Sequence, residues 1–343
     1  MPLVTDLIAL DIGGANLKAA DGLGWSASVA FPLWKRWREL PVAVGDLVAG
    51  RGPRRLVATM TGEICDCYAS RAEGVAHIAA SLVAAATALG CPEPPGVYLV
   101  NGRVVGPAEA TRDWRLAAAS NWHATARLAA SLVREERAVL LDIGSTTTDI
   151  VPLRAGRPAP QARDDAGRLL CGELVYTGVE RTPVAALAPR LPHRGMPRPV
   201  ASERFADSLD AWLMLGALPE NPAAADTADG GPATREAARA RLARTMLLDP
   251  KEFTVNDAVE AATEIAARQA ALIALALEQV AQVAGGPPAA VVLAGHGDML
   301  AELALGRAGW RPRLERLADA AGPAVARAAP AHALALLARG ALR

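Results

Sequence analysis

The chain contains a short internal repeat, which restricts the folds that it can adopt. The first copy runs from Ile8 to Lys18 and the second from Val139 to Asp149. Each copy is an apolar run, then Asp-Ile-Gly, then small or polar residues that lead into a second strand-like run. Short apolar runs of this kind are typical of buried strands. We therefore predict a duplicated α/β fold with a cleft between its two lobes.

The composition excludes several classes of protein. The chain has 343 residues, of which 52% are hydrophobic, so a disordered chain is excluded. The 36 basic and 36 acidic side chains cancel, which argues against an electrostatic nucleic-acid binder. The most apolar long stretch, residues 257–284, is interrupted by charged side chains. We therefore expect no nucleic-acid partner and no membrane span.

Cysteine usage and the first residues bear on location. Four cysteines in a chain of this length do not indicate a disulfide scaffold. Residues 1–6 lack the basic and apolar segments of a cleavable leader. We therefore expect a cytoplasmic protein that acts on small molecules. A homodimer is the general expectation for an enzyme of this kind.

Strand-like and helix-like segments alternate along both halves of the chain. We predict a first lobe over residues 1–137 and a second over residues 138–343, with a helical insertion around residues 189–285. The prolines of residues 189–199 and the small residues of 219–232 predict loops in that insertion. The other predicted strands and helices are 55–60, 73–89, 96–100, 121–134, 234–247, 256–284 and 290–294.

The first repeat has the composition of an anion-binding loop. At Gly13–Gly14 no Cβ blocks the approach of backbone N–H groups to an anion, and Asn16 follows as a further binding candidate. Lys18 can add a positive charge to a bound phosphate, and Asp11 is placed to hold Mg²⁺. A dinucleotide-binding loop would require G-x-G-x-x-G entering a helix, whereas residues 18–22 lead into a strand. An ordinary glycine turn is the remaining alternative.

The second repeat and a third glycine turn supply matching groups. The second repeat contains four consecutive hydroxyl residues, 145–148, which can reflect β propensity alone. However, two equivalent Asp-x-Gly turns in the two halves would face each other across a cleft. They would form both sides of a phosphate-and-metal site, with Asp11 and Asp142 as metal ligands. The third turn suits a flat base or another part of a ligand. The residues concerned are Asp142, Gly144, Ser145, Thr146, Thr147, Asp149, Gly295, His296 and Gly297.

Two further pairs of polar residues are candidates, each with a structural alternative. Thr61 and Glu63 follow the predicted strand at 55–60, where ligand binding and a simple turn are both reasonable interpretations. His123 lies next to Trp122 and near Asn121 on a predicted helix. It is either a ligand-binding residue or a buried histidine with a satisfied hydrogen bond.

Candidates in the second half have similar alternatives. Thr177 and Arg181 could contact the carboxylate of an anionic acceptor or belong to a plain turn. Asp229 lies before an arginine-rich stretch, residues 235–244. That stretch either gates an anionic substrate or forms a solvated helix face.

Longer motifs spread over the chain carry a family resemblance. The order of the Asp-Ile-Gly loops and the Gly295 turn resembles the superfamily of sugar kinases, heat-shock chaperone ATPases and actin, which has a duplicated ribonuclease H-like fold. Within it the chain resembles the hydantoinase/oxoprolinase branch. It is most similar there to proteins of methanofuran or methylofuran biosynthesis and tetrahydromethanopterin-linked one-carbon metabolism. The motifs are residues 10–18, 59–66, 120–125, 172–178 and 227–230.

The resemblance implies a transferase that forms an aryl ether. It would join a furanmethanol diphosphate to the phenol oxygen of a γ-glutamyl-tyramine acceptor and release pyrophosphate. A diphosphate leaving group needs Mg²⁺, N–H donors and a cation such as Lys18. The phenol needs a base, for which Asp142 and Asp149 are the first candidates, followed by His123 and Glu63.

Two other classes of function remain open at this point. Because the superfamily commonly cleaves ATP, an ATP-dependent kinase or a hydantoinase/oxoprolinase-like amidohydrolase is one alternative. A non-enzymatic nucleotide-binding scaffold is the other. We expect Mg²⁺ as the cofactor and leave open whether ATP binds, because one cleft can be reused for a different diphosphate.

Overall fold

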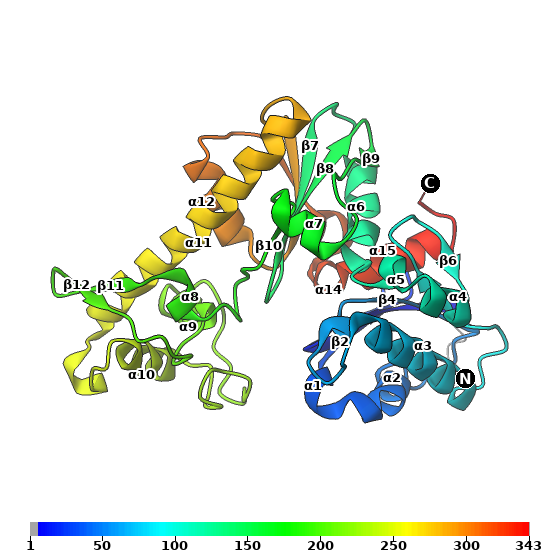
Figure 1. Ribbon diagram of the computed structural model, residues 1–343, viewed down its shortest axis with the longest axis horizontal. Coiled ribbons are helices and arrows are strands. Elements are labelled where there is room, and N and C mark those ends of the chain that lie inside the picture. Colours follow the sequence, from blue (N-terminus) through cyan, green and yellow to red (C-terminus); the bar gives the residue numbers. More distant parts are fainter. Residues whose placement is uncertain (1–5, 343) are drawn as a thin grey trace.

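The computed structural model describes residues 6–342, which form two sheets with helices packed on them (Figure 1). The first sheet has the strand order β3-β2-β1-β4-β5-β6. Its first strand, β1, pairs antiparallel with β2 and parallel with β4, and every residue of β1 is buried. The strands are β1 Leu7–Ile12, β2 Asn16–Ala20, β3 Ser26–Ala30, β4 Arg55–Met60, β5 Gly96–Tyr98 and β6 Val104–Val105.

The second sheet repeats the central pairing of the first. Its order is β10-β8-β7-β13-β14, with β9 on the edge of β8. Strand β7 pairs antiparallel with β8 and parallel with β13, as β1 does with β2 and β4. The strands are β7 Ala138–Ile143, β8 Thr148–Arg154, β9 Arg157–Pro158, β10 Leu174–Val175, β13 Ala290–Gly295 and β14 Arg313–Arg316. The predicted fold, a duplicated ribonuclease H-like α/β fold of the actin-like type, is confirmed.

Helices cover the sheets and connect the lobes. In the first half they are α1 Leu33–Arg36, η1 Trp37–Glu39, α2 Leu40–Leu47, η2 Gly62–Ile64, α3 Arg71–Ala88, α4 Pro107–Arg112, α5 Trp114–Ala117 and α6 Asn121–Leu132. Around the second sheet they are α7 Asp165–Leu170, α12 Asp298–Arg307, α13 Leu317–Ala321, α14 Pro323–Arg327 and α15 Ala329–Ala338. None of the helices within residues 6–342 is both long enough and apolar enough to cross a membrane.

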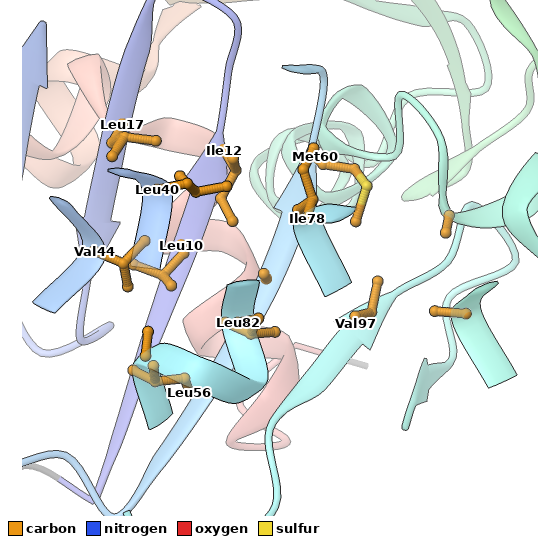
Figure 2. Close-up of a cluster of buried hydrophobic side chains, with 14 of the residues drawn as sticks. Leu10, Ile12, Leu17, Leu40, Val44, Leu56, Met60, Ile78, Leu82 and Val97 are labelled. Atoms are coloured by element: carbon orange, nitrogen blue, oxygen red, sulfur yellow. The ribbon is translucent and has the colours of Figure 1, made fainter. Parts of the chain in front are cut away.

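The first sheet has a core of its own on one face. Figure 2 shows Leu10 and Ile12 of β1 with Val44 of α2 and Ile78 and Leu82 of α3. These side chains are at most 1% exposed. Burial of each apolar side chain contributes about 1.5–3 kcal/mol. This packing fixes the direction of β1 and therefore the position of the loop that follows it.

A second core joins the two lobes. It contains Leu128 of α6, Leu334 of α15, Val57 of β4 and Leu140 of β7. Helix α15, near the end of the chain, packs against α6, β1 and β4, so a C-terminal element covers the first sheet. The division of the chain at residues 137 and 138 stays a prediction.

The insertion packs around the first half of the long helix α11, away from the strands of the second sheet (Figure 1). It has its own apolar core, in which Phe253 is fully buried. Residues 190–199 are a β-hairpin rather than the loop that their prolines predict. This two-stranded ribbon consists only of edge strands, which tolerate proline. The elements are α8 Val184–Leu187, β11 Arg190–His193, β12 Met196–Pro199, α9 Ser208–Met214, α10 Arg235–Thr245, η3 Pro250–Glu252 and α11 Val255–Ala284.

Candidate active site

The two repeat loops adopt the same turn. The backbone N–H of Gly13 donates to the carbonyl oxygen of Asn16 at 3.1 Å, and the N–H of Gly144 donates to that of Thr147 at 3.0 Å. A Cβ on Gly13 would lie 2.9 Å from the Asn16 oxygen, so this turn excludes larger residues at that position. The repeat seen in the sequence is therefore also a repeat of loop geometry.

A second pair of turns is equivalent in the two lobes. The N–H of Thr61, after β4, donates to Ile12, and the N–H of His296, after β13, donates to Ile143, both at 3.0 Å. Gly295 has φ +82°, and a Cβ there would lie 2.1 Å from the Ile143 oxygen. Each lobe thus presents two turns from adjacent strand ends.

These four turns line one cavity of about 620 Å³ between the lobes. The predicted site residues that line it come from both sheets and from the start of α6. They are Asp11, Gly13, Gly14, Asn16, Lys18, Thr61, Asn121, Asp142, Gly144, Ser145, Thr146, Thr147, Asp149, Arg181, Gly295 and His296.

The carboxylates of the cavity lie in different electrostatic environments. Lys18 Nζ is 3.5 Å from Asp11 Oδ2, but burial still raises the pKa of Asp11 above its ordinary value. Burial and the nearby Asp149 raise the pKa of Asp142 to about 7. The other oxygen of Asp11, Oδ1, is buried and has no hydrogen-bond partner among the described residues. Ionisation of these carboxylates is therefore unfavourable in the cavity as it stands, and a bound cation would stabilise their charged forms.

Asp149 is held by Arg168 of α7, a residue that the sequence analysis did not identify. Arg168 Nη2 donates to Asp149 Oδ1 at 2.8 Å and to the Glu173 carbonyl oxygen at 2.9 Å. Its guanidinium carbon lies 4.1 Å from the centroid of the Trp122 ring. Burial raises the pKa of Asp149, and Arg168 acts against that increase. A single arginine on a short helix carries no motif that would reveal this contact.

Glu180, Trp34 and Trp122 also line the cavity and were not predicted as site residues. His296 Nε2 lies 3.0 Å from Glu180 Oε1. Burial acts to raise the pKa of Glu180, but the contact with His296 lowers it overall. Arg181 lies over the ring of Trp34, which together with Trp122 contributes aromatic surface to the cavity. These contacts join segments far apart in the chain and leave no local sequence pattern.

Two predicted catalytic residues lie outside the cavity lining. Glu63 is 1% exposed and forms an ion pair of 2.7 Å with Arg71, which also bonds to Asp165 of the second lobe at 2.6 Å. His123 Nδ1 lies 2.7 Å from the hydroxyl of Tyr98, and burial lowers the pKa of His123 to about 4. Both contacts are structural links within or between the lobes.

Three predicted binding residues also lie elsewhere. Thr177 is buried and accepts a hydrogen bond of 2.8 Å from Gln269 Nε2. Asp229 belongs to the insertion and pairs with Arg241 at 3.0 Å. A Cβ on Gly297 would lie 2.4 Å from the Ile143 side chain, so this glycine permits close packing beneath the turn.

The donor set of the cavity fits one kind of metal. No group of three or more His, Cys, Asp or Glu side chains within residues 6–342 is arranged to hold a metal ion by itself. Asp11 instead offers a buried carboxylate with an unpaired oxygen, and Asp142 offers a half-buried one. Mg²⁺ usually takes one or two carboxylates and completes its shell with phosphate oxygens and water.

Together, the duplicated fold and the paired loops define a two-lobed actin-like protein whose cleft is lined by glycine turns from both lobes. The sequence model of the hydantoinase/oxoprolinase family matches residues 54–337. The chain belongs to the hydantoinase/oxoprolinase family.

Curated relatives are enzymes of one kind. A protein of Methanocaldococcus jannaschii is 33% identical over 264 residues, which cover 76% of this chain and 77% of the relative. A protein of Methanococcus vannielii is 33% identical over 149 residues, 43% of this chain and 65% of the relative. Both are named (4-{4-[2-(γ-L-glutamylamino)ethyl]phenoxymethyl}furan-2-yl)methanamine synthase.

Solved structures with more distant likeness include kinase and pilus proteins. A ROK-family glucokinase of Streptomyces griseus has a TM-score of 0.47 at 16% identity. The match covers 97% of this chain and 99% of the glucokinase. A PilM–PilN pilus biogenesis complex has a TM-score of 0.49 at 13% identity, with 96% and 98% covered. The strand order and pairing described above define the fold of this chain.

Proposed function

We propose that this chain is a transferase that joins the phenol oxygen of a γ-glutamyl-tyramine acceptor to the methylene carbon of a furanmethanol diphosphate. The new C–O bond forms the aryl ether, the bond from that carbon to the diphosphate oxygen breaks, and pyrophosphate leaves. The phenolic proton passes to a carboxylate of the protein and then to solvent. The product class is the aryl ether of a methanofuran-type cofactor.

One observation carries this proposal above the others. The synthase of Methanocaldococcus jannaschii is 33% identical to this chain across most of both chains. Its name describes a phenoxymethyl-furan joined to a γ-glutamylaminoethyl group, which is an aryl ether. The cavity of this chain supports such a reaction, because it combines glycine loops, a lysine and several carboxylates.

The glycine loops suit the diphosphate. The backbone N–H groups of Gly14, Ser145 and Thr146 have no acceptor within the described chain, and all three residues line the cavity. Lys18 adds a positive charge at the same end of β1 and β2. Donors held in place before the reaction stabilise the negative charge that grows on the leaving oxygen.

Asp11 and Asp142 are the residues that would hold Mg²⁺. When bound, Mg²⁺ would neutralise charge on the diphosphate oxygens. The unpaired oxygen of Asp11 and the raised pKa of Asp142 support this assignment. The chain itself holds the two carboxylates at equivalent positions on β1 and β7, the central strands of the two sheets.

Asp149 is the proposed acceptor of the phenolic proton. Its Oδ1 is occupied by Arg168, which leaves Oδ2 for the substrate. Arg168 also places a positive charge beside Asp149, because its Nη2 donates to Asp149 Oδ1 at 2.8 Å. The phenol has an ordinary pKa of about 10, so it is mostly protonated at neutral pH. A base that accepts the phenolic proton, with a cation beside it, makes ionisation of the phenol easier.

A coupled assay tests the proposed function. The enzyme is incubated with Mg²⁺, the furan diphosphate and the phenolic acceptor, and pyrophosphate is measured; ATP replaces the furan diphosphate in a parallel reaction. Pyrophosphate release that requires both substrates supports the proposal. ATP hydrolysis without ether formation would instead support a kinase or amidohydrolase, and inactivity in both reactions would support a scaffold.

A further inference from the structure

Arg181 is a cavity cation that has no acidic partner among the described residues. Lys18 pairs with Asp11 at 3.5 Å and Arg168 with Asp149 at 2.8 Å. Arg181 forms no ion pair within residues 6–342; its guanidinium carbon instead lies 5.0 Å from the centroid of the Trp34 ring. An arginine stacked on a ring by its face keeps the N–H donors along its edge free.

The backbone of Arg181 is attached to the second repeat loop. Its N–H donates to the carbonyl oxygen of Ser145 at 2.9 Å, and the N–H of Glu180 donates to the same oxygen at 3.0 Å. The N–H of Val179 donates to Gly144 at 3.0 Å. A movement of this loop must therefore move Arg181 with it.

Trp34 is attached to the first repeat loop in the other lobe. The N–H groups of Phe31 and Leu33, which precede it, donate to Ala15 and Gly14, both at 2.8 Å. The contact between Arg181 and Trp34 thus connects the two loops directly. It exists only while the lobes keep this arrangement.

The charge of Arg181 also reaches the first loop. The Cys65 thiol lies 2.9 Å from where a Cβ on Gly14 would be. Burial raises the pKa of Cys65, and Arg181 is the cation that acts against that increase. Arg181 also lines the cavity together with Gly14 of the first loop and Ser145 of the second, so its charge is available to a ligand held between the two loops.

We propose that Arg181 binds the diphosphate across the cleft, between the glycine loops of the two lobes. Trp34 holds the guanidinium by its face, while the N–H groups along its edge bind diphosphate oxygens. This inference deepens the proposed function and rests on the diphosphate being the ligand of the cleft. It differs from the carboxylate contact that the sequence suggests for Arg181.

Calorimetric titration with inorganic pyrophosphate in the presence of Mg²⁺ tests this inference without turnover. Arg181→Met is expected to weaken binding by about tenfold or more, because a charged hydrogen-bonding partner is lost. Arg181→Lys should restore part of the affinity, since it keeps the charge but not the planar donors. Arg51→Met is the matched control, because Arg51 lies 4.2 Å from the Trp25 ring centroid and neither residue lines the cavity.

The outcomes separate this inference from the proposed function. If wild-type protein binds pyrophosphate, and Arg181→Met and Arg181→Lys bind it with unchanged affinity, the inference is wrong. It is equally wrong if pyrophosphate does not bind wild-type protein, or if Arg181→Met raises only the KM for the γ-glutamyl acceptor. If binding depends on Arg181 but no ether forms with both substrates, the inference holds and the proposed reaction fails.

Discussion

Asp142 faces Asp149 across the β7–β8 ladder, at the position where Asp11 faces Lys18 across β1 and β2. The duplicated halves have therefore diverged at one position, from a cation in the first lobe to a carboxylate in the second. The like charge of Asp149 adds to burial in raising the pKa of Asp142 to about 7. The second lobe contributes acidic groups, while the first contributes the lysine.

The metal assignment predicts the behaviour of Asp142→Asn. This variant should lose about a hundredfold or more of its Mg²⁺-dependent turnover, because an amide binds Mg²⁺ more weakly than a carboxylate. It should fold as well as the wild type, since the amide has the same shape and removes a buried charge. Turnover measured against Mg²⁺ concentration, with a thermal melt of each protein, checks both statements. Full turnover at the wild-type Mg²⁺ concentration would disprove the assignment.

The proposed base predicts a selective loss in Asp149→Asn. We expect kcat to fall by about 10²–10⁴-fold, with a smaller change in the KM of the acceptor. The matched control is Asp210→Asn, because Asp210 forms a buried ion pair of 2.7 Å with Arg241 in the insertion, outside the cavity. That variant should lower the melting temperature but keep kcat. Equal kcat losses in the two variants would show a structural effect only.

The turn after β13 predicts that Gly295→Ala is not tolerated. The residue has φ +82°, and the new Cβ would lie 2.1 Å from the Ile143 oxygen and 2.8 Å from Asp142 Oδ1. We expect a loss of about 2 kcal/mol or more in the free energy of unfolding, together with reduced turnover. Gly285→Ala is the matched control, because Gly285 has φ +86° but no atom would lie within 4 Å of the new Cβ. That control should cost only about 1 kcal/mol, and an equal loss in urea denaturation of both variants would contradict the packing argument.

The half-buried His123 of α6 predicts a pH dependence of stability. Burial lowers the pKa of His123 to about 4, whereas the unfolded chain has its ordinary value of 6.5. Between these values the unfolded state binds the additional proton, so the stability contributed by neutral His123 is lost as the pH falls from 6.5 towards 4. The limiting slope is about 1.4 kcal/mol per pH unit, with a total of up to about 3 kcal/mol.

Urea denaturation of His123→Gln at several pH values measures that contribution. The variant should show a shallower decline in stability over this range than the wild type. An unchanged slope would mean that His123 is protonated at the same pH in both states. Turnover near neutral pH should keep the same pH profile, because His123 is uncharged there.

The fold was largely predictable because its signal is local and occurs twice. The apolar runs before Asp11 and Asp142 became the buried central strands, and Gly13 and Gly144 became equivalent turns. The pattern of charged and apolar residues was also sufficient to identify α11. The helix was predicted to begin at residue 256, and it begins at Val255. The hairpin at 190–199 was missed because proline marks a loop more often than an edge strand.

The site was predictable only where one segment carried the chemistry. Arg168 binds Asp149 from a separate helix, and the Trp34 that contacts Arg181 belongs to the other lobe. No spacing along the chain records such contacts, because packing of the two sheets creates them. The environment of His123 could not be predicted for the same reason. Its hydrogen-bond partner, Tyr98, belongs to β5 and meets α6 only in the folded core.

The most direct test of the account follows the phenol oxygen. Enzyme, Mg²⁺ and furan diphosphate are incubated with an acceptor that carries ¹⁸O in its phenol group, and the products are analysed by mass spectrometry. The account predicts an ether product that keeps the label, together with unlabelled pyrophosphate in equal amount. Label in the released phosphate, or no ether with both substrates present, would contradict it.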